Sequence, residues 1–293
     1  MKKIYALTLL LAFLMLPSQI LAANLPKVYY NGNLLQNIQT KGDYTYIPLR
    51  DICTIIDWQE KTQTISAQHP SGAILTLQIG KKAATLEQNG EKQSLTLTTA
   101  PYKSNGTTYV PLRFAGEALG YTIYWDKATQ ITIIYQRNAQ SEAALQSADL
   151  ATARNAAIKL PHINLMETLK SSQENISSIT YIFPYGESKR FVEKIGYILK
   201  YYEVRDGAAW LVWQGEIGTD DKIMEEQGER PEFGNKQVYF NDYFQADSIT
   251  YGTIENNKMQ QIEEIKNISS QSPGGDWKNR IIVHSIQDET KID

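Results

Sequence analysis

Cysteine and histidine are nearly absent from this chain, and each shortage excludes a kind of chemistry. The single cysteine, Cys53, has no partner for an intramolecular disulfide. Stability must therefore come from packing, and we interpret Cys53 as part of that packing. The three histidines, His69, His162 and His284, lie far apart in the sequence. Since copper and zinc sites need several converging ligands, we expect no metal, no cofactor and no catalytic residues.

The chain also lacks an excess of positive charge. Its 29 Lys and Arg residues are outnumbered by 32 Asp and Glu residues, which gives a net charge of -3. Nucleic-acid-binding domains usually carry a basic stripe, so nucleic acid is not an expected partner. Phosphate-binding loops, zinc-ligand spacings and dinucleotide fingerprints are missing as well.

Long apolar runs are missing except at the N-terminus. Two lysines, Lys2 and Lys3, precede the apolar run 4–16, and small residues follow it. This pattern predicts a secretory signal peptide over residues 1–22, cut after Ala22 or, as a second choice, after Ala23. An uncleaved anchor is the alternative, although the run is shorter than the roughly 20 residues that span a bilayer. We expect an exported protein of the cell envelope or the exterior, with no later membrane span.

A repeated motif is the most informative feature that is present. Residues 44–50 (YTYIPLR) match residues 107–113 (TTYVPLR). Each copy is expected to continue into a short helix whose apolar face consists of Ile52, Ile55 and Ile56 in the first copy and of Ala115, Ala118 and Leu119 in the second. A tryptophan follows each copy, Trp58 and Trp125. We expect both tryptophans to pack on the core.

Short signals around the two copies predict local structure. Asn31-Gly32 and Asn89-Gly90 precede the copies and predict hairpin turns, because both residue types tolerate positive φ. The arginines that end the motifs, Arg50 and Arg113, stand at helix starts, where the helix dipole does not favour a cation. We therefore expect each arginine to bond a carboxylate or a carbonyl across the two halves.

These residues carry a resemblance to a known family. Residues from about 28 to 135 resemble the copper amine oxidase N-terminal-like domain, or stalk domain, of bacterial exported proteins. The resemblance rests on Asn89-Gly90, on 109–114 (YVPLRF), on 117–120 (EALG) and on Trp125-Asp126. It implies an antiparallel sheet wrapped around a helix, and a role as an attachment or spacer module.

The resemblance does not extend to oxidase chemistry. An amine oxidase needs a histidine-rich copper site and a tyrosine that becomes a quinone cofactor, within an Asn-Tyr-Asp or Asn-Tyr-Glu motif. The nearest string here is Asn241-Asp242-Tyr243, in which the order is different. We therefore expect no enzymatic activity.

The rest of the chain predicts a connector and a second domain. Residues 138–175 are expected to be a helical connector, with an alanine-rich helix up to about Lys159 and a short helix over 164–171. Residues 176–293 are expected to be an α+β domain of unknown family. Its predicted strands cover 178–183, 196–204, 208–217, 236–244, 248–254, 259–268 and 280–286, and Asp206-Gly207 forms a hairpin turn.

Candidate chemistry in this second domain is weak. An acidic run could bind calcium, although a solvated loop is the favoured interpretation; it consists of Asp220, Asp221, Glu225, Glu226 and Glu229. His284, Ser285 and Asp288 are residue types of a hydrolase triad, but no nucleophile motif accompanies them. Trp210 and Trp213 could stack on a sugar, but we expect them to face opposite sides of a strand and to pack in cores.

The sequence therefore predicts an α+β fold with a stalk domain over residues 24–137, built from two related halves that share a core. The expected function is a non-catalytic binding or scaffold role in the envelope, with cell wall glycan or an envelope protein as possible partner. A small-molecule or peptide carrier with a C-terminal pocket is the first alternative. An envelope hydrolase with an unrecognised site is the second, and the oligomeric state is left open.

Overall fold

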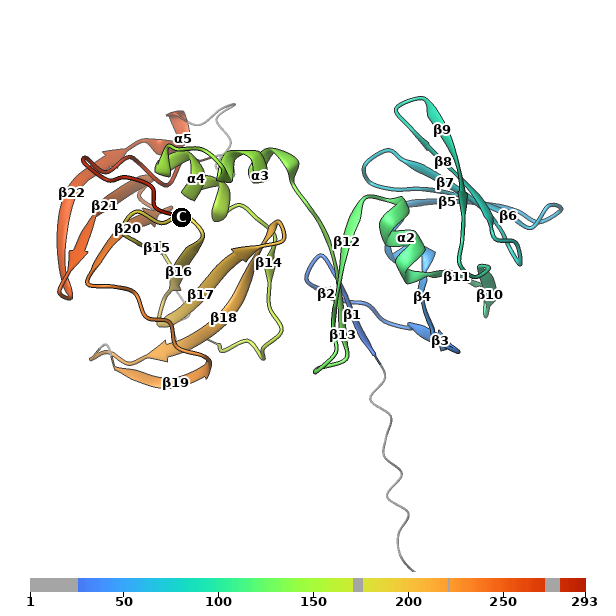
Figure 1. Cartoon of the computed structure of the whole chain (residues 1–293), viewed down its shortest axis with the longest axis horizontal. Coiled ribbons are helices and arrows are strands. Elements are labelled where there is room, and N and C mark those ends of the chain that lie inside the picture. The colour runs from blue at the N-terminus through green and yellow to red at the C-terminus, as the bar shows by residue number, and fades with distance from the viewer. Residues whose placement is uncertain (1–25, 171–175, 221, 272–279) are drawn as a thin grey trace, which may run out of the picture.

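The computed structural model describes residues 26–170, 176–220, 222–271 and 280–293. Two lobes are visible in Figure 1, an N-terminal lobe that ends with strand β13 and a C-terminal lobe that begins with helix α3. The predicted signal peptide, residues 1–22, lies outside the described residues. Among those residues, no helix combines the length and the apolar character needed to cross a membrane.

Three sheets build the N-terminal lobe. The first has the order β12-β13-β1-β2, with Tyr121–Asp126, Ile131–Gln136, Lys27–Tyr30 and Asn33–Leu34. The second has the order β10-β11-β4-β3, with Tyr102–Ser104, Thr107–Pro111, Tyr44–Pro48 and Gln39–Lys41. The third is a meander of β5 to β9, with Ile55–Gln59, Thr64–Gln68, Ile74–Gln78, Ala83–Gln88 and Glu91–Thr96.

The predicted hairpin turns are confirmed. Asn31-Gly32 joins β1 to β2 and Asn89-Gly90 joins β8 to β9, with φ of 46° and 53° at the two asparagines. Asp206-Gly207 joins strands β17 (Ile198–Arg205) and β18 (Ala208–Ile217) in the same way. Two consecutive residues with positive φ match the twist of the flanking strands, which explains this turn chemistry.

The two motif copies lie side by side but continue differently. Strands β4 and β11 are antiparallel partners, with Ile47 opposite Val110. The second copy leads into helix α2 (Leu112–Ala118), as predicted. The first leads only into a single 3-10 turn, η1 (Leu49–Asp51), and then into strand β5.

The predicted first helix is therefore wrong. Ile55 and Ile56 lie on β5 with 60% and 40% of their surface exposed, and only Ile52 is buried. The spacing explains the difference. Nine residues separate Pro48 from Trp58, whereas thirteen separate Pro111 from Trp125. The four missing residues amount to about one helical turn, so the first copy has no room for both a helix and a strand.

One apolar core joins the sheets of the N-terminal lobe. Buried side chains from all three sheets and from α2 meet in it, among them Val28, Ile47, Leu75, Leu77, Val110, Ala115 and Leu119. Leu119 is buried in this core as predicted, whereas Ala118 is only half-buried. The domain boundaries drawn from the sequence stay a prediction.

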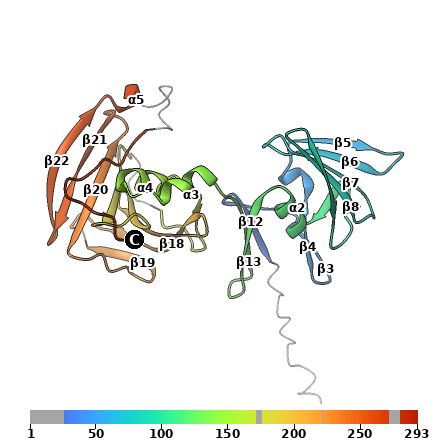
Figure 2. The same ribbon diagram turned by 45° about the horizontal axis from the view of Figure 1, so that its top comes forward.

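A nine-stranded sheet forms most of the C-terminal lobe. Its order is β14-β18-β17-β16-β15-β20-β21-β22, and β19 pairs with β18. The remaining bounds are His162–Ile163 for β14, Ile179–Pro184 for β15, Arg190–Ile195 for β16, Ile223–Gly228 for β19, Lys236–Tyr243 for β20, Ser248–Glu255 for β21 and Lys258–Lys266 for β22. In Figures 1 and 2 this sheet curves around helices α3 (Ala139–Leu145) and α4 (Leu150–Ala157), and a short helix α5 (Ile268–Gln271) follows it.

The helical connector differs from the prediction. Asn138 and Asp149 each accept a hydrogen bond from a backbone N–H in the first turn of the next helix, so the alanine-rich stretch forms two capped helices instead of one. Residues 164–170 form no helix. The Asn164 side chain accepts from the Met166 N–H and thus competes with helix formation there.

The last predicted strand is also wrong, because residues 280–286 have no strand structure. The segment is held by side chains. Arg154 of α4 forms a fully buried ion pair of 2.6 Å with Glu289, and Val283 lies in the core between sheet and helices.

The fold class predicted from the sequence is wrong. Strands make up 49% of the structure and helices 11%, distributed over several sheets, so the molecule is mostly β and is not an α+β fold of two related halves. The short apolar patterns that indicate helices in this sequence are also produced by β-branched residues in strands.

Candidate functional site

An open groove on the N-terminal lobe collects exposed aromatic and charged side chains. It has a volume of about 460 Å³, and we define it by Asp43, Tyr44, Arg113, Ile123 and Trp125. Asp43 ends the turn between β3 and β4, and Tyr44 begins β4. Ile123 and Trp125 are two residues apart on β12 and therefore point to the same face.

The side chains of the open groove are accessible to a ligand. Trp125 and Tyr44 each expose 44% of their surface. Arg113 is exposed at the start of α2 and has no hydrogen-bond or ion-pair partner within the described part of the chain. The predictions that Trp125 packs on the core and that Arg113 bonds across the lobe are therefore wrong. Sequence reasoning also missed Tyr44, although the Gly42-Asp43 turn places an aromatic residue at the start of a strand.

A second groove, which we call the closed groove because Lys103 lies over its tryptophan, contains the corresponding residues of the first motif copy. It has a volume of about 240 Å³ and is lined by Arg50, Trp58, Lys103 and Gly106, with four further residues. The Lys103 ammonium lies 4.1 Å from the centre of the Trp58 ring. Arg50 donates a hydrogen bond of 3.3 Å to the Gly106 carbonyl, which confirms the prediction for this arginine.

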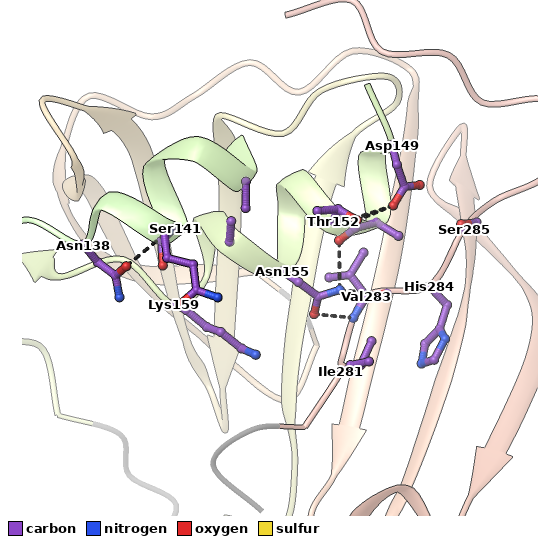
Figure 3. Close-up of a pocket in the computed structure, with 14 residues that line it drawn as sticks. Asn138, Ser141, Asp149, Thr152, Asn155, Lys159, Ile281, Val283, His284 and Ser285 are labelled. Atoms are coloured by element: carbon purple, nitrogen blue, oxygen red, sulfur yellow. Dashed lines mark hydrogen bonds between the residues drawn. The ribbon is translucent and has the colours of Figure 1, made fainter. Parts of the chain in front are cut away.

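A third groove, about 620 Å³, lies between helices α3 and α4 and the C-terminal segment, as Figure 3 shows. Most of its polar side chains hold the fold. Asn138 and Asp149 cap the two helices. Asn155 bonds the backbone of Val283 through both ends of its amide, with its nitrogen 2.8 Å from the carbonyl oxygen. We call this the connector groove.

The triad residue types do not form a triad. His284 lines the connector groove and stacks on Tyr251 with ring centres 5.5 Å apart. Burial lowers the pKa of His284, and its Nε2 atom is buried without a hydrogen bond. Among the residues that the structure describes, no hydrogen bond joins His284 to Ser285 or Asp288.

Two residues of the acidic run pair with neighbouring cations. Asp220 contacts Lys222 at 2.6 Å and Glu226 contacts Arg230 at 2.7 Å, while Asp221 lies outside the described residues. Over the described ranges, no group of three or more His, Cys, Asp or Glu side chains could hold a metal ion. The absence of cofactors stays a prediction.

Other residues singled out in the sequence have structural surroundings. Cys53 is buried, and that burial raises the pKa of its thiol to about 11, which disfavours the reactive thiolate. Trp210 and Trp213 are both buried in different apolar clusters, as predicted. The His162 ring lies 4.6 Å from the Tyr202 ring, centre to centre, at a tilt of 40°, and His69 is hydrogen-bonded to Tyr121 elsewhere in the fold.

Two solved structures show a distant likeness to this chain. A virginiamycin B lyase from Staphylococcus aureus shares 11% identity over 80% of this chain and 83% of its own, with a TM-score of 0.14. The β-propeller domain of Cps50 (Swd1) from Myceliophteria thermophila shares 6% identity over 73% and 86%, with a TM-score of 0.12. Both scores are too low to carry an argument about fold.

Comparisons with sequences place only the N-terminal lobe. No characterised protein sequence matches the chain significantly. A family model does match, and its matched residues include both motif copies and both tryptophans. Residues 30–134 match the copper amine oxidase N-terminal domain family, which confirms the resemblance that the motifs indicated.

Proposed function

We propose that this chain is an exported, non-catalytic protein of the bacterial cell envelope that attaches to cell wall material through the open groove. The observation that carries the proposal is the exposure of Trp125 and Tyr44 beside the unpaired Arg113. Tryptophan, tyrosine and arginine are the residues that most often dominate binding surfaces.

The experiment is co-sedimentation of the purified mature chain with insoluble bacterial cell walls. Trp125→Ala should reduce the bound fraction strongly, because the variant removes the largest accessible aromatic surface of the groove. Tyr243→Ala is the matched control, since Tyr243 is an exposed aromatic residue of the C-terminal lobe. Equal binding by wild type and Trp125→Ala would contradict attachment through this groove.

Export and the absence of catalysis have their own tests. Protein recovered from the cell exterior should begin at Ala23 or Asn24 by intact-mass measurement, and a chain that retains Met1 there would refute the signal peptide. An amine oxidation assay with and without copper should show no turnover. Stoichiometric copper together with hydrogen peroxide release would overturn the non-catalytic assignment.

A second candidate function is small-molecule or peptide carriage by the C-terminal lobe. The connector groove, with its unpaired His284 Nε2 atom, favours this candidate. The centre of the lobe argues against it, because Phe183, Phe191 and Phe240 are fully buried between sheet and helices and fill that space. Native mass spectrometry of freshly purified protein should show no co-purified molecule; a bound one would favour the carrier.

A further inference from the structure

The two motif copies place the same pair of residue types in two grooves. Arg50 and Trp58 of the first copy line the closed groove. Arg113 and Trp125, which correspond to them in the sequence, line the open groove. The closed groove therefore indicates which chemical groups the arginine and the tryptophan of the open groove can bind.

In the closed groove the chain supplies those groups itself. One short segment, residues 103–106 (KSNG), provides both. Its lysine ammonium lies over the Trp58 ring, and its glycine carbonyl, three residues later, accepts from Arg50. A cation over an indole face is attracted by the ring quadrupole, and this attraction increases as water is removed.

In the open groove the corresponding arginine and tryptophan have no such partners in the described part of the chain. Trp125 has no ring or cation partner, and Arg113 has no acceptor, among the residues described. We propose that the open groove binds a peptide through a lysine-type ammonium placed over Trp125 and a backbone carbonyl bound by Arg113. The inference rests on the proposed function and names the group that the groove recognises.

The rest of the lining complements such a ligand. Asp43 supplies a carboxylate for the ammonium, and within the described residues it has no hydrogen-bond or ion-pair partner. Ile123 supplies apolar surface for the methylenes of a lysine side chain. The open groove is nearly twice the volume of the closed one, about 460 Å³ against 240 Å³, so it has room for flanking backbone as well.

Calorimetric titration of the mature chain with the peptide acetyl-Lys-Ser-Asn-Gly-amide tests the proposal. This probe copies the segment whose lysine and glycine line the closed groove. The same peptide with its side-chain amine acetylated is the matched control, because it keeps every atom of the backbone but loses the cation. We expect binding of the first peptide and none of the second. Equal binding of both would overturn the proposal.

Protein variants locate the site. Trp125→Ala should weaken binding about 3- to 30-fold, which is the range expected for loss of a cation–π contact. Tyr243→Ala, in the other lobe, should leave binding unchanged. Trp125→Phe retains an aromatic face and should weaken binding less than Trp125→Ala. The indole N–H signal that disappears in Trp125→Ala identifies Trp125 in the wild-type NMR spectrum, and that signal should shift when the peptide is added. An unshifted Trp125 signal would overturn the proposal without any variant.

A parallel titration with a glycan distinguishes this inference from the proposed function. Chitotetraose should not shift the Trp125 signal. If it does, and the lysine peptide does not, the groove recognises sugar, so the inference is wrong although attachment through the groove stands. If Trp125→Ala leaves cell wall binding intact while the peptide still binds, the proposed function is wrong and the inference stands.

Discussion

At the scale of single residues, a buried hydrogen-bond chain joins two sheets of the N-terminal lobe. His69 Nδ1 accepts from the Ser71 N–H, so Nε2 carries the proton and donates to the Tyr121 hydroxyl at 2.6 Å. The Tyr121 hydroxyl in turn contacts that of Tyr30. His69 exposes only 2% of its surface, and burial lowers its pKa. These hydrogen bonds therefore require a neutral imidazole, because a protonated ring could not accept from the Ser71 N–H.

This histidine should make stability depend on pH. In the unfolded chain His69 titrates near its ordinary pKa of 6.5, whereas in the folded chain it titrates lower. Between these values the unfolded state binds more protons, so the free energy of unfolding is highest above about pH 6.5 and falls as pH decreases. One such group contributes a slope of at most about 1.4 kcal/mol per pH unit.

Urea unfolding at about pH 7.5 and about pH 5.5 measures the effect. His69→Gln keeps hydrogen-bonding capacity without a titrating group, so it should lose less stability between the two values than the wild type does. An identical loss in both proteins would show that other groups cause the pH dependence.

At the scale of elements, the two motif copies differ in the structure that comes after the proline. Helix α2 and the residue after it direct Leu119 into the core, while strand β5 directs Ile55 into solvent. Apolar spacing alone predicts a buried helix face for both side chains. That prediction is correct where thirteen residues lie between proline and tryptophan, and wrong where only nine do.

Two substitutions measure this difference. Leu119→Ala should lower the free energy of unfolding by about 2–5 kcal/mol, because it leaves a cavity in the shared core. Ile55→Ala should change it by less than about 0.5 kcal/mol, since the side chain is 60% exposed. Denaturant melts provide both values. Similar losses in the two variants would support the helix predicted from the sequence instead of strand β5.

At the scale of the whole molecule, the lobes contact each other through one apolar cluster. Trp210 of β18 packs against Tyr124 with ring centres 4.6 Å apart, and against Ile131, Ile133 and Tyr135 of β13. The Tyr135 hydroxyl donates to the Asp206 carbonyl at 2.9 Å. The chain crosses between the lobes at the exposed residues 136–138. Trp210 therefore couples the lobes, and Arg137 at the crossing offers a trypsin site.

Limited trypsin digestion tests this coupling. Trp210→Ala should be cleaved faster after Arg137 than the wild type, because loss of the cluster allows the lobes to separate. Trp213→Ala is the control, since Trp213 is equally buried but belongs to a cluster within the C-terminal lobe. If both variants are cleaved at Arg137 at the same rate, general destabilisation explains the effect and the cluster does not hold the lobes together.

The sequence by itself determined the features that depend on neighbouring residues. The Asn-Gly and Asp-Gly turns and strand β18 could be predicted because turn chemistry and β-prone residues act over a few positions. The family resemblance belongs to the same class, since it rests on ordered local motifs.

Only the tertiary structure decided the fold class and the accessibility of the site. Trp58 and Trp125 follow matching motifs, yet Lys103 covers the first and nothing in the described chain covers the second. Which segment reaches a side chain depends on sheet order and on segments distant in sequence. Both tryptophans lie on strands, and the copy with four fewer residues between proline and tryptophan keeps the strand but lacks the helix.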